Sequence, residues 1–257
     1  MDLQVPTAEL VALLLAGVRA AAWLVFAPPF AGRMMPATVK ALLSVALALP
    51  LVPQLIAKVP DPSSPQLIVS LFEQVVIGTA LGFLTSLLFA AVQAAGNLID
   101  LAGGFSVAVA FDPFGASGNG GSAVFGRFYN VVATTLLFVT NGHMMVLRGF
   151  AQSYRTLPLD GTLSLHTLQE LLTTGLTQMF LAALQIAGPL VAVLFCADIG
   201  LGLLNRAAPA LNAFTLGFPV KILLVLTAAG LGFALLPRAV SGLVDQIVKA
   251  VVAAAGG

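Results

Sequence analysis

The chain has 257 residues, of which 59% are hydrophobic and only 8% are charged, and its formal net charge is +1. Because a soluble domain carries about 25% charged residues, this composition excludes an ordinary soluble domain and indicates a protein of the lipid bilayer or of a tight hetero-oligomer. The near-zero net charge excludes a basic nucleic-acid-binding surface, and the single cysteine, Cys196, excludes a disulfide framework. We expect Cys196 to be a small buried apolar residue.

Six apolar runs dominate the chain, and most reach the length of about 20 residues that a helix needs to cross a bilayer. Asp2 and Glu9 precede or begin the first run without any Lys or Arg, which is the wrong charge for a cleaved signal peptide, so we expect this run to remain in the mature protein. The predicted fold class is all-α, an integral-membrane-type bundle of about six long, partly broken helices. These helices are predicted over residues 10–30, 41–56, 67–95, 123–147, 171–204 and 213–236.

Prolines make two of these runs irregular. The second run is short for a span because Pro36 and Pro53 bound it, whereas the fifth is too long for a single span. Gly188 and Pro189 lie inside the fifth run, and we expect a kink or a split there because a proline removes one helix hydrogen bond. Unequal, broken helices of this kind are typical of the packed core of a channel or transporter.

Three hydrophilic segments separate or follow the apolar runs. Residues 58–65 contain three prolines and are expected to form an exposed linker. Residues 148–170 are the most hydrophilic stretch and are predicted to form a solvated loop, with Ser164 as the N-cap of a helix that begins near Leu165 and with His166 exposed. In residues 238–257, apolar side chains at helical spacing predict an amphipathic C-terminal helix that lies on a membrane or against a partner helix.

A glycine-rich segment separates the third and fourth runs, at residues 103–126 with the sequence GGFSVAVAFDPFGASGNGGSAVFG. Its glycines favour turns over a regular helix. Non-helical backbone at membrane depth is tolerated only inside protein or along a water-filled cavity. We therefore expect a loop that lines, caps or blocks whatever the helices enclose.

No motif for metal, nucleotide or cofactor binding is evident in the sequence. His143 and His166 share no metal-ligand spacing with each other or with Cys196, and HExxH, CxxC and Walker motifs are lacking. Residues 115–118, GASG, resemble the nucleophile segment of rhomboid intramembrane proteases, whose serine needs a histidine base on a neighbouring helix. His143 is only 26 residues on, in a polar turn, His166 is in the solvated loop, and the upstream His and Asn that bind the oxyanion in such proteases have no counterpart. We therefore expect no enzyme activity and no cofactor. A secondary transporter or small-solute channel would show internal repeats and charged substrate ligands, and neither is convincing here.

Arg19, Glu73 and Asp198 are ionisable residues inside apolar runs, where such residues are candidates for function. Asp198 and Asn205 are seven residues apart and face the same way on a helix, which favours an interhelical polar contact that fixes the geometry of assembly. An ion or proton relay would need more acids and histidines than these runs contain.

Residues 197–222, ADIGLGLLNRAAPALNAFTLGFPVKI, resemble the FliR family of bacterial export-gate proteins. The start of the chain at residues 19–30, the order of the apolar runs and Asp112-Pro113 in the glycine-rich segment agree with the same family. The resemblance extends over residues 1–257 as a single export-gate domain. Residues 217–221, GFPVK, favour the flagellar branch over the sister branch that serves virulence injectisomes, which stays an alternative.

The resemblance implies one subunit of a hetero-oligomeric helical gate, built of broken helical hairpins together with FliP and FliQ and contacted by FlhB and FlhA. Unfolded flagellar proteins would cross its central pore at the bacterial inner membrane, in the flagellar basal body, with the gate raised largely above the bilayer plane. Energy input would come from the partners, because this chain has no motif for it.

The resemblance also implies roles for two sets of residues. The glycine-rich segment would be the plug of the closed pore, in which apolar side chains seal and glycines supply hinge freedom. A loop simply packed between subunits is the alternative. The plug residues are Phe105, Val107, Val109, Phe111, Asp112, Pro113, Phe114, Gly115, Gly118, Gly120 and Gly121. The family motif would serve subunit packing, with helix breaks at its two prolines, through Asp198, Asn205, Arg206, Pro209, Asn212, Phe214, Gly217, Phe218, Pro219 and Lys221.

Overall fold

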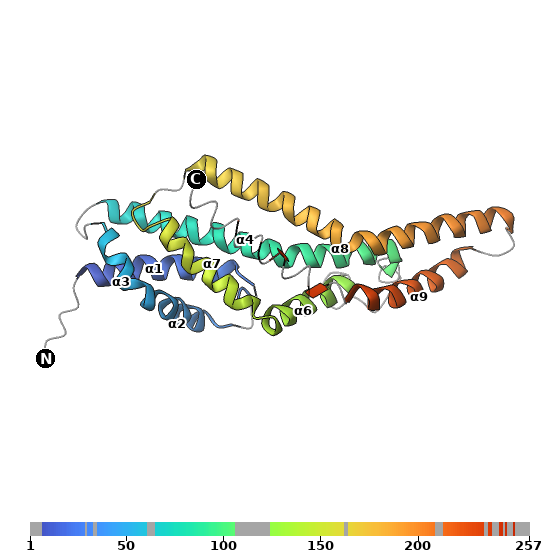
Figure 1. Cartoon of the computed structure of the whole chain (residues 1–257), viewed down its shortest axis with the longest axis horizontal. Coiled ribbons are helices and arrows are strands. Elements are labelled where there is room, and N and C mark those ends of the chain that lie inside the picture. Colours follow the sequence, from blue (N-terminus) through green and yellow to red (C-terminus); the bar gives the residue numbers. More distant parts are fainter. Residues whose placement is uncertain are drawn as a thin grey trace. The chain divides into compact units, whose positions relative to one another are not determined.

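The computed structural model describes residues 7–28, 30–32, 35–60, 65–105, 124–161, 164–208 and 213–233, together with residues 236, 237, 242, 243, 245 and 249 (Figure 1). These residues form helices and connections without a strand, so the predicted all-α class is confirmed. The helices are α1 (Thr7–Phe26), α2 (Ala37–Ala48), η1 (Leu49–Leu51), α3 (Val52–Leu55), η2 (Ile56–Lys58), α4 (Gln66–Gly103), α6 (Val124–Val139), α7 (Gly142–Thr156), α8 (Leu165–Ala207) and α9 (Ala213–Phe233).

Length and hydropathy make several of the described helices candidates for membrane spans. Four qualify by length and composition, namely α1, the segment Ala37–Leu55, α4 and α8. The consecutive helices α6 and α7 raise the number to five if the pair counts as one broken span. The predicted membrane-type bundle of long, partly broken helices is therefore confirmed.

Prolines act differently in the two irregular runs. In the second run α2 ends at Ala48, and the chain continues through Pro50 and Pro53 as the short segments η1, α3 and η2. In the fifth run α8 continues as one helix of 43 residues with Pro189 inside it, so the alternative of a split at this position is wrong. One proline removes a single N–H donor, and the hydrogen bonds on both sides of it are enough to continue a helix of this length.

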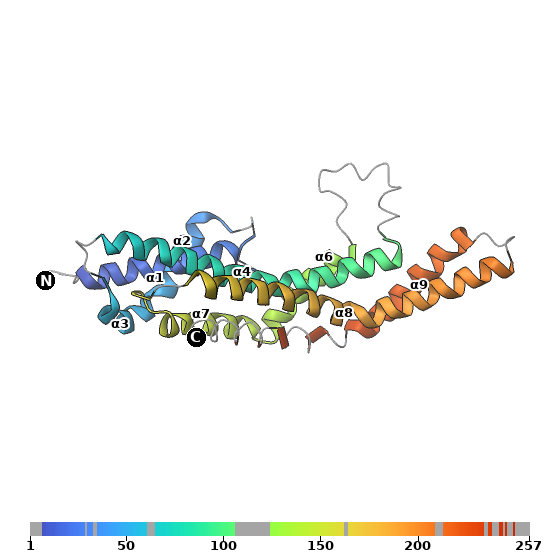
Figure 2. The same cartoon turned by 90° about the horizontal axis from the view of Figure 1, so that it is seen from above.

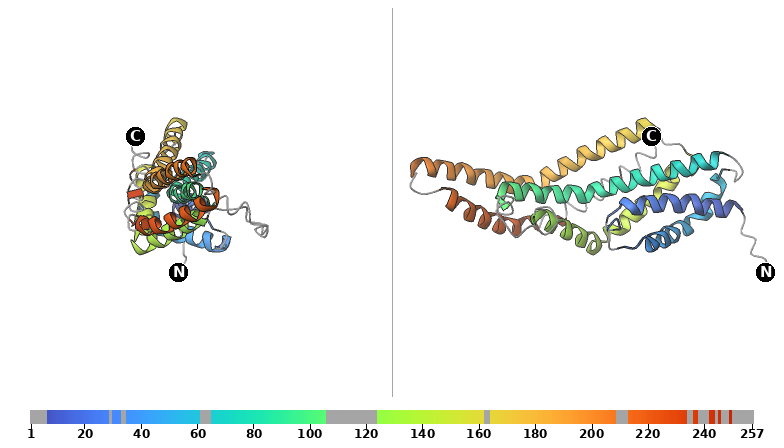
Figure 3. Two further views of the ribbon diagram at one scale, coloured as in Figure 1. Left: turned by 90° about the vertical axis from the view of Figure 1, so that its right-hand side faces the viewer. Right: turned by 180° about the vertical axis from the view of Figure 1, so that it is seen from behind.

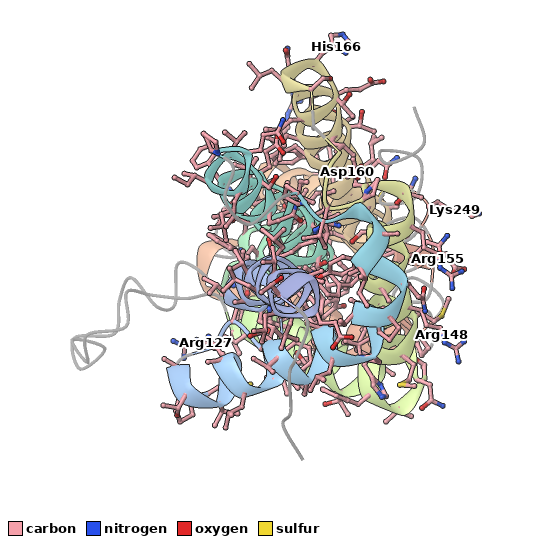
Figure 4. The ribbon with its side chains drawn as sticks, turned by 90° about the vertical axis from the view of Figure 1, so that its left-hand side faces the viewer. Arg127, Arg148, Arg155, Asp160, His166 and Lys249 are labelled. Atoms are coloured by element: carbon pink, nitrogen blue, oxygen red, sulfur yellow. The ribbon has the colours of Figure 1, made fainter. Side chains whose placement is uncertain are left out.

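The hydrophilic stretch at residues 148–170 is not a loop throughout. Helix α7 extends to Thr156, and Phe150, Ser153 and Tyr154 on its inner face are buried. Arg148 and Arg155 are exposed and point away from the helices around them in Figure 4, which explains why the stretch reads as hydrophilic. The connection is thus confined to residues 157–164.

The start of α8 agrees with the prediction made for Ser164. Helix α8 begins at Leu165, and the Ser164 hydroxyl oxygen accepts a hydrogen bond of 3.1 Å from the backbone N–H of Thr167. A serine at this position supplies an acceptor for a first-turn amide that has no partner inside the helix. His166 is exposed, as predicted (Figure 4).

The fourth run forms two helices rather than one. Helix α6 ends at Val139 and α7 begins at Gly142. Asn141, between them, has a left-handed backbone with φ of 57°. Asparagine tolerates this conformation better than most residues, and it ends one helix before the next begins.

The chain, predicted as one domain over residues 1–257, forms two compact units. Unit 1 comprises Met1–Leu88, Asn141–Thr177 and Val244–Gly257, and unit 2 comprises Phe89–Thr140 and Gln178–Leu243. Helices α4 and α8 each contribute residues to both units.

Helix α1 is the centre of unit 1, where it packs against α2, α4 and α7 (Figure 2). Its core side chains include Leu15, Trp23 and Leu24, and Trp23 stacks on Phe150 of α7 with ring centroids 4.6 Å apart. On α4, Gly78 and Gly82 face α1 so closely that a methyl group at either position would collide with it. At Gly82 this methyl carbon would lie 2.8 Å from the Trp23 carbonyl oxygen, so small residues spaced by four let the two backbones meet.

Unit 2 is built from α6, α9 and the later parts of α4 and α8. Within it, α8 and α9 lie side by side as an antiparallel hairpin, seen in orange and red in the right-hand view of Figure 3 and again in Figure 1. Gly217 of α9 is buried, and a methyl group there would lie 3.5 Å from a Leu201 methyl of α8. Gly96 of α4 approaches α6 more closely, since a methyl group there would lie 2.7 Å from the Gly126 Cα atom.

Candidate functional site

Most of the predicted plug lies outside the described residues. This applies to Val107, Val109, Phe111, Asp112, Pro113, Phe114, Gly115, Gly118, Gly120 and Gly121. Phe105 is described, and its ring meets the ring of Phe125 edge-on with centroids 5.1 Å apart. The structure therefore shows where the glycine-rich segment leaves α4 and where it enters α6. We call residues 96–105 and 124–126 the loop base.

Asp100 holds the two sides of the loop base together. It lies in the last turn of α4, only 1% of its surface is exposed, and its Oδ2 atom accepts hydrogen bonds from the backbone N–H groups of Phe125 and Gly126, at 2.8 and 3.1 Å. These two amides belong to the first turn of α6, where N–H groups have no partner within the helix and the helix dipole favours a negative charge. A carboxylate from one helix thus caps the other.

Two glycines shape the way in which the chain leaves α4. Gly103 ends the helix, and a methyl group there would lie 2.8 Å from a methyl carbon of Val225 on α9. Gly104 follows with φ of 79°, a backbone conformation that costs glycine little. The C-terminal part of α4 is therefore packed against both α6 and α9.

Asp198 and Lys221 of the family motif form an ion pair that links α8 to α9. The Asp198 side chain is 47% exposed and that of Lys221 is 18% exposed, so water screens the pair only in part. Asn205, which shares a face with Asp198 in the sequence pattern, is exposed, as is Arg206. The ionic contact of Asp198 among the described residues is thus with the neighbouring helix of the same chain.

The prolines of the family motif differ in whether the structure describes them. Pro219 lies inside α9, which continues through it, so the helix break expected at this proline is wrong. Pro219 is the seventh residue of this helix, so its ring removes one interior N–H donor, and the hydrogen bonds on both sides of it continue the helix. Pro209 and Asn212 and the side chains of Phe214 and Phe218 lie outside the described part of the chain.

Arg19 is the centre of a polar cluster in unit 1. It is fully buried, its Nε atom donates to Gln74 Oε1 at 2.6 Å, and its Nη1 atom donates to the Ser153 carbonyl at 3.2 Å. Its guanidinium carbon lies 4.4 Å from the centre of the Tyr154 ring, and the Tyr154 hydroxyl donates to the Ala16 carbonyl at 2.8 Å. Arg19 therefore connects α1, α4 and the C-terminal end of α7.

Sequence reasoning selected Arg19 but missed its partners and Asp100. Gln74 and Tyr154 give no signal of their own in the sequence. Asp100 does give one, because it is an acid in an apolar helix. It was passed over because the third run was predicted to end at residue 95, whereas α4 ends at Gly103.

No acid, histidine or cysteine cluster that could hold a metal ion occurs among the described side chains. Cys196 is exposed on α8, so the expectation that it is buried is wrong. Cys196 lies on an exposed apolar face of α8 and not in the interior of unit 2.

Comparison with known proteins decides the family. The family described as bacterial export proteins, family 1, matches residues 10–247. A flagellar biosynthetic protein FliR from Pectobacterium carotovorum subsp. carotovorum is 32% identical over 231 residues, which cover 90% of this chain and 87% of the relative. The chain belongs to the FliR family. The FliR protein of Escherichia coli (strain K12) is 33% identical over 202 residues, covering 76% of this chain and 74% of the relative.

Proteins that carry a name other than FliR match this chain as well. The surface presentation of antigens protein SpaR of Shigella flexneri is 30% identical over 156 residues, which cover 61% of this chain and 59% of the relative. Membership of the FliR family, which residues 197–222 indicated in the sequence, is thus confirmed by matches over most of the chain.

Proposed function

We propose that this chain is a subunit of the flagellar type III secretion export gate. In this gate it forms, with FliP and FliQ and in contact with FlhB and FlhA, the pore through which unfolded flagellar proteins leave the cell. The observation that carries the proposal is the match to FliR proteins along nearly the whole chain, at 32% identity over 231 residues. In this proposal the chain acts as part of a conduit rather than as an enzyme, in the bacterial inner membrane at the flagellar basal body.

The exposed apolar surface of unit 2 supports an assembled state. Several large apolar side chains on α8 and α9 are more than half exposed, which we take as a sign of contact with lipid or with partner chains. The residues are Phe180, Leu181, Leu184, Phe195, Ile199, Leu203, Leu223 and Leu226. Neighbouring gate subunits and lipid would cover them.

The proposal includes the glycine-rich segment as the plug of the closed pore. Its support is chemical: the segment combines apolar side chains that can exclude ions with glycines that permit rearrangement. The described loop base gives it a fixed point of departure and of return.

Native mass spectrometry of the detergent-extracted protein, co-expressed with FliP-like and FliQ-like proteins, tests the assembly. We expect one defined complex that contains this chain with both partners. A stable monomer or homodimer would contradict the proposal and would make solute uptake the next measurement.

A virulence injectisome gate is the second candidate, and the similarity to SpaR supports it. The flagellar assignment is preferred because the FliR proteins of Pectobacterium carotovorum and Escherichia coli match at higher identity and over more of the chain than SpaR does. Complementation separates the two. The gene should restore motility to a bacterium that lacks its own FliR, and restoration only of injectisome secretion would favour the second candidate.

A further inference from the structure

The cap on α6 is not supplied by its own chain neighbourhood. The Asp100 carboxylate precedes the two amides that it binds by 25 and 26 residues, and it reaches them from α4. An ordinary cap would come from residue 123, directly before α6, where the sequence has alanine. The hydrogen bonds that satisfy the first turn of α6 therefore also connect two helices.

Burial makes this connection strong. Asp100 is 1% exposed, and a charge-assisted hydrogen bond that water does not reach is stronger than one at the surface. Its other oxygen, Oδ1, is buried without a hydrogen-bond partner among the described residues. A buried carboxylate with only one of its two oxygens hydrogen-bonded costs folding free energy. We therefore expect its geometry to serve a purpose.

The surrounding contacts leave the loop base little freedom. Gly96 meets the backbone of Phe125 and Gly126, Phe105 packs on Phe125, and Gly103 meets Val225. The contacts of Gly103 and Phe105 lie at the end of α4 where the glycine-rich segment begins, and those of Gly96 lie about two turns earlier on the same helix. Among these contacts of the loop base, only the hydrogen bonds of Asp100 are polar. Because hydrogen bonds are directional, they fix the orientation of the first turn of α6 relative to α4 as well as the distance between them.

We propose that Asp100 is a positioning residue of the gate: its carboxylate clamps the C-terminal end of α4 to the first turn of α6 and so fixes the two ends of the glycine-rich segment at the spacing that seals the pore. This inference rests on the proposed plug function. It adds the residue that sets the position of the plug, which the family resemblance does not name.

Four variants in the co-expressed gate complex separate a clamp from a simple helix cap. Asp100→Ala removes the acceptor. Asp100→Asn keeps an oxygen in place. The double variant Asp100→Ala, Ala123→Asp restores a cap to α6 from its own N-cap position without any bond to α4. Asn130→Ala is the matched control, because it removes the exposed 3.3 Å hydrogen bond from Asn130 to Gln93 that joins the same two helices.

Hydrogen exchange of the peptide over residues 124–130 measures how firmly the first turn of α6 is held. The ion leak per assembled complex measures how well the pore is sealed. We expect Asp100→Ala to speed exchange on the order of tenfold, the scale of a lost helix cap, and to raise the leak. Asp100→Asn should change both readouts far less. The double variant should restore slow exchange yet still leak, and Asn130→Ala should match the unmodified complex.

Two results would overturn the clamp. One is a tight seal in the double variant, since a local cap would then suffice. The other is fast exchange in Asp100→Ala without any leak.

If Asp100→Ala does not assemble, the variant Asp100→Glu replaces it, because its longer side chain keeps the charge but displaces the acceptor. Unchanged exchange and no leak in Asp100→Glu would contradict the inference. A complex that lacks residues 115–121 serves as the reference for plug loss, so a leak there but not in the Asp100 variants refutes the clamp alone, whereas no leak there refutes the plug and the clamp together.

Discussion

At the scale of single residues, the buried Arg19 shows how a charge is tolerated without a salt bridge. Among the described residues its contacts are the side-chain amide oxygen of Gln74, the backbone carbonyl of Ser153 and the face of the Tyr154 ring. Ser153 lies in the last turn of α7, where the helix dipole presents its negative end, and the electron-rich ring face attracts a cation as well. The planar guanidinium can meet all three at once, which an ammonium group cannot.

Arg19→Lys should therefore lower the stability of the protein. The ammonium group cannot keep both hydrogen bonds, and a buried acceptor left without a donor costs about 1–3 kcal/mol. Thermal unfolding in detergent measures the effect. Arg155→Lys on the exposed face of α7 is the control and should stay within about 0.5 kcal/mol of the unmodified protein. Equal unfolding of the two variants would show that the shape of the guanidinium does not matter.

At the scale of helices, backbone contact decides which glycines can be replaced. Gly78 of α4 faces the Arg19 carbonyl oxygen and the Ala22 side chain of α1, whereas Gly17 of α1 has no atom within 4 Å of an added methyl group. Both glycines lie inside helices of the same unit, but only one lies at the contact of two backbones.

Gly78→Ala should thus destabilise unit 1 by about 1–3 kcal/mol, because the methyl group forces α1 and α4 apart. Gly17→Ala should be neutral or stabilising by up to about 1 kcal/mol, because alanine is the better helix former. The same unfolding measurement compares them. A Gly78→Ala protein as stable as the Gly17→Ala protein would contradict the close packing of α1 and α4.

The hairpin of α8 and α9 leads to a prediction about assembly. Asp198→Leu leaves Lys221 without its ionic partner, so we expect less gate complex in native mass spectra. The exchanged pair Asp198→Lys, Lys221→Asp should recover part of the yield, because it restores the attraction between the helices. Normal assembly of Asp198→Leu with failed secretion would mean that this pair acts in transport rather than in assembly.

Sequence reasoning succeeded at this scale where local chemistry decides and failed where tertiary contacts decide. Ser164 marks the start of α8 because a cap depends on a few neighbouring residues. The inner face of α7 escaped prediction because Phe150 and Tyr154 alternate with Arg148 and Arg155, whose charges dominate any average over the stretch. The contact of Asp100 with α6 depends on how the chain returns to α4, which no local pattern contains.

At the scale of the whole molecule, the family and the all-α membrane-type class were predictable because lipid-type helices and a dense motif need no knowledge of contacts. The number of long helices was not, since six were predicted and four described helices or segments reach membrane length, or five if α6 and α7 count as one broken span. The two compact units were not predicted, because α4 and α8 contribute to both and give no change in composition at the boundary. The plug residues between 107 and 121 stay a prediction.

Deletion of residues 115–121 tests the plug in the assembled gate. Removal of the glycine-rich centre of the segment should leave the complex intact, because the loop base and the helices are untouched. The membrane should then leak ions, since the remaining residues cannot span the pore. Conductance of reconstituted complexes, compared with that of Asn130→Ala complexes, measures the leak. Lost assembly with an unchanged leak would refute the plug.

The Arg19 cluster has a consequence for biosynthesis. An arginine in the middle of a lipid-inserted helix costs about 2.5–3.5 kcal/mol, and α1 is synthesised long before its partners. Ser153 follows Arg19 by 134 residues, so translation at about 5–20 residues per second leaves the guanidinium without this acceptor for on the order of ten seconds. During that interval we expect α1 to insert poorly and to be open to attack by membrane proteases. Truncated chains that end before α7 should therefore be degraded quickly in the cell, whereas complete chains survive.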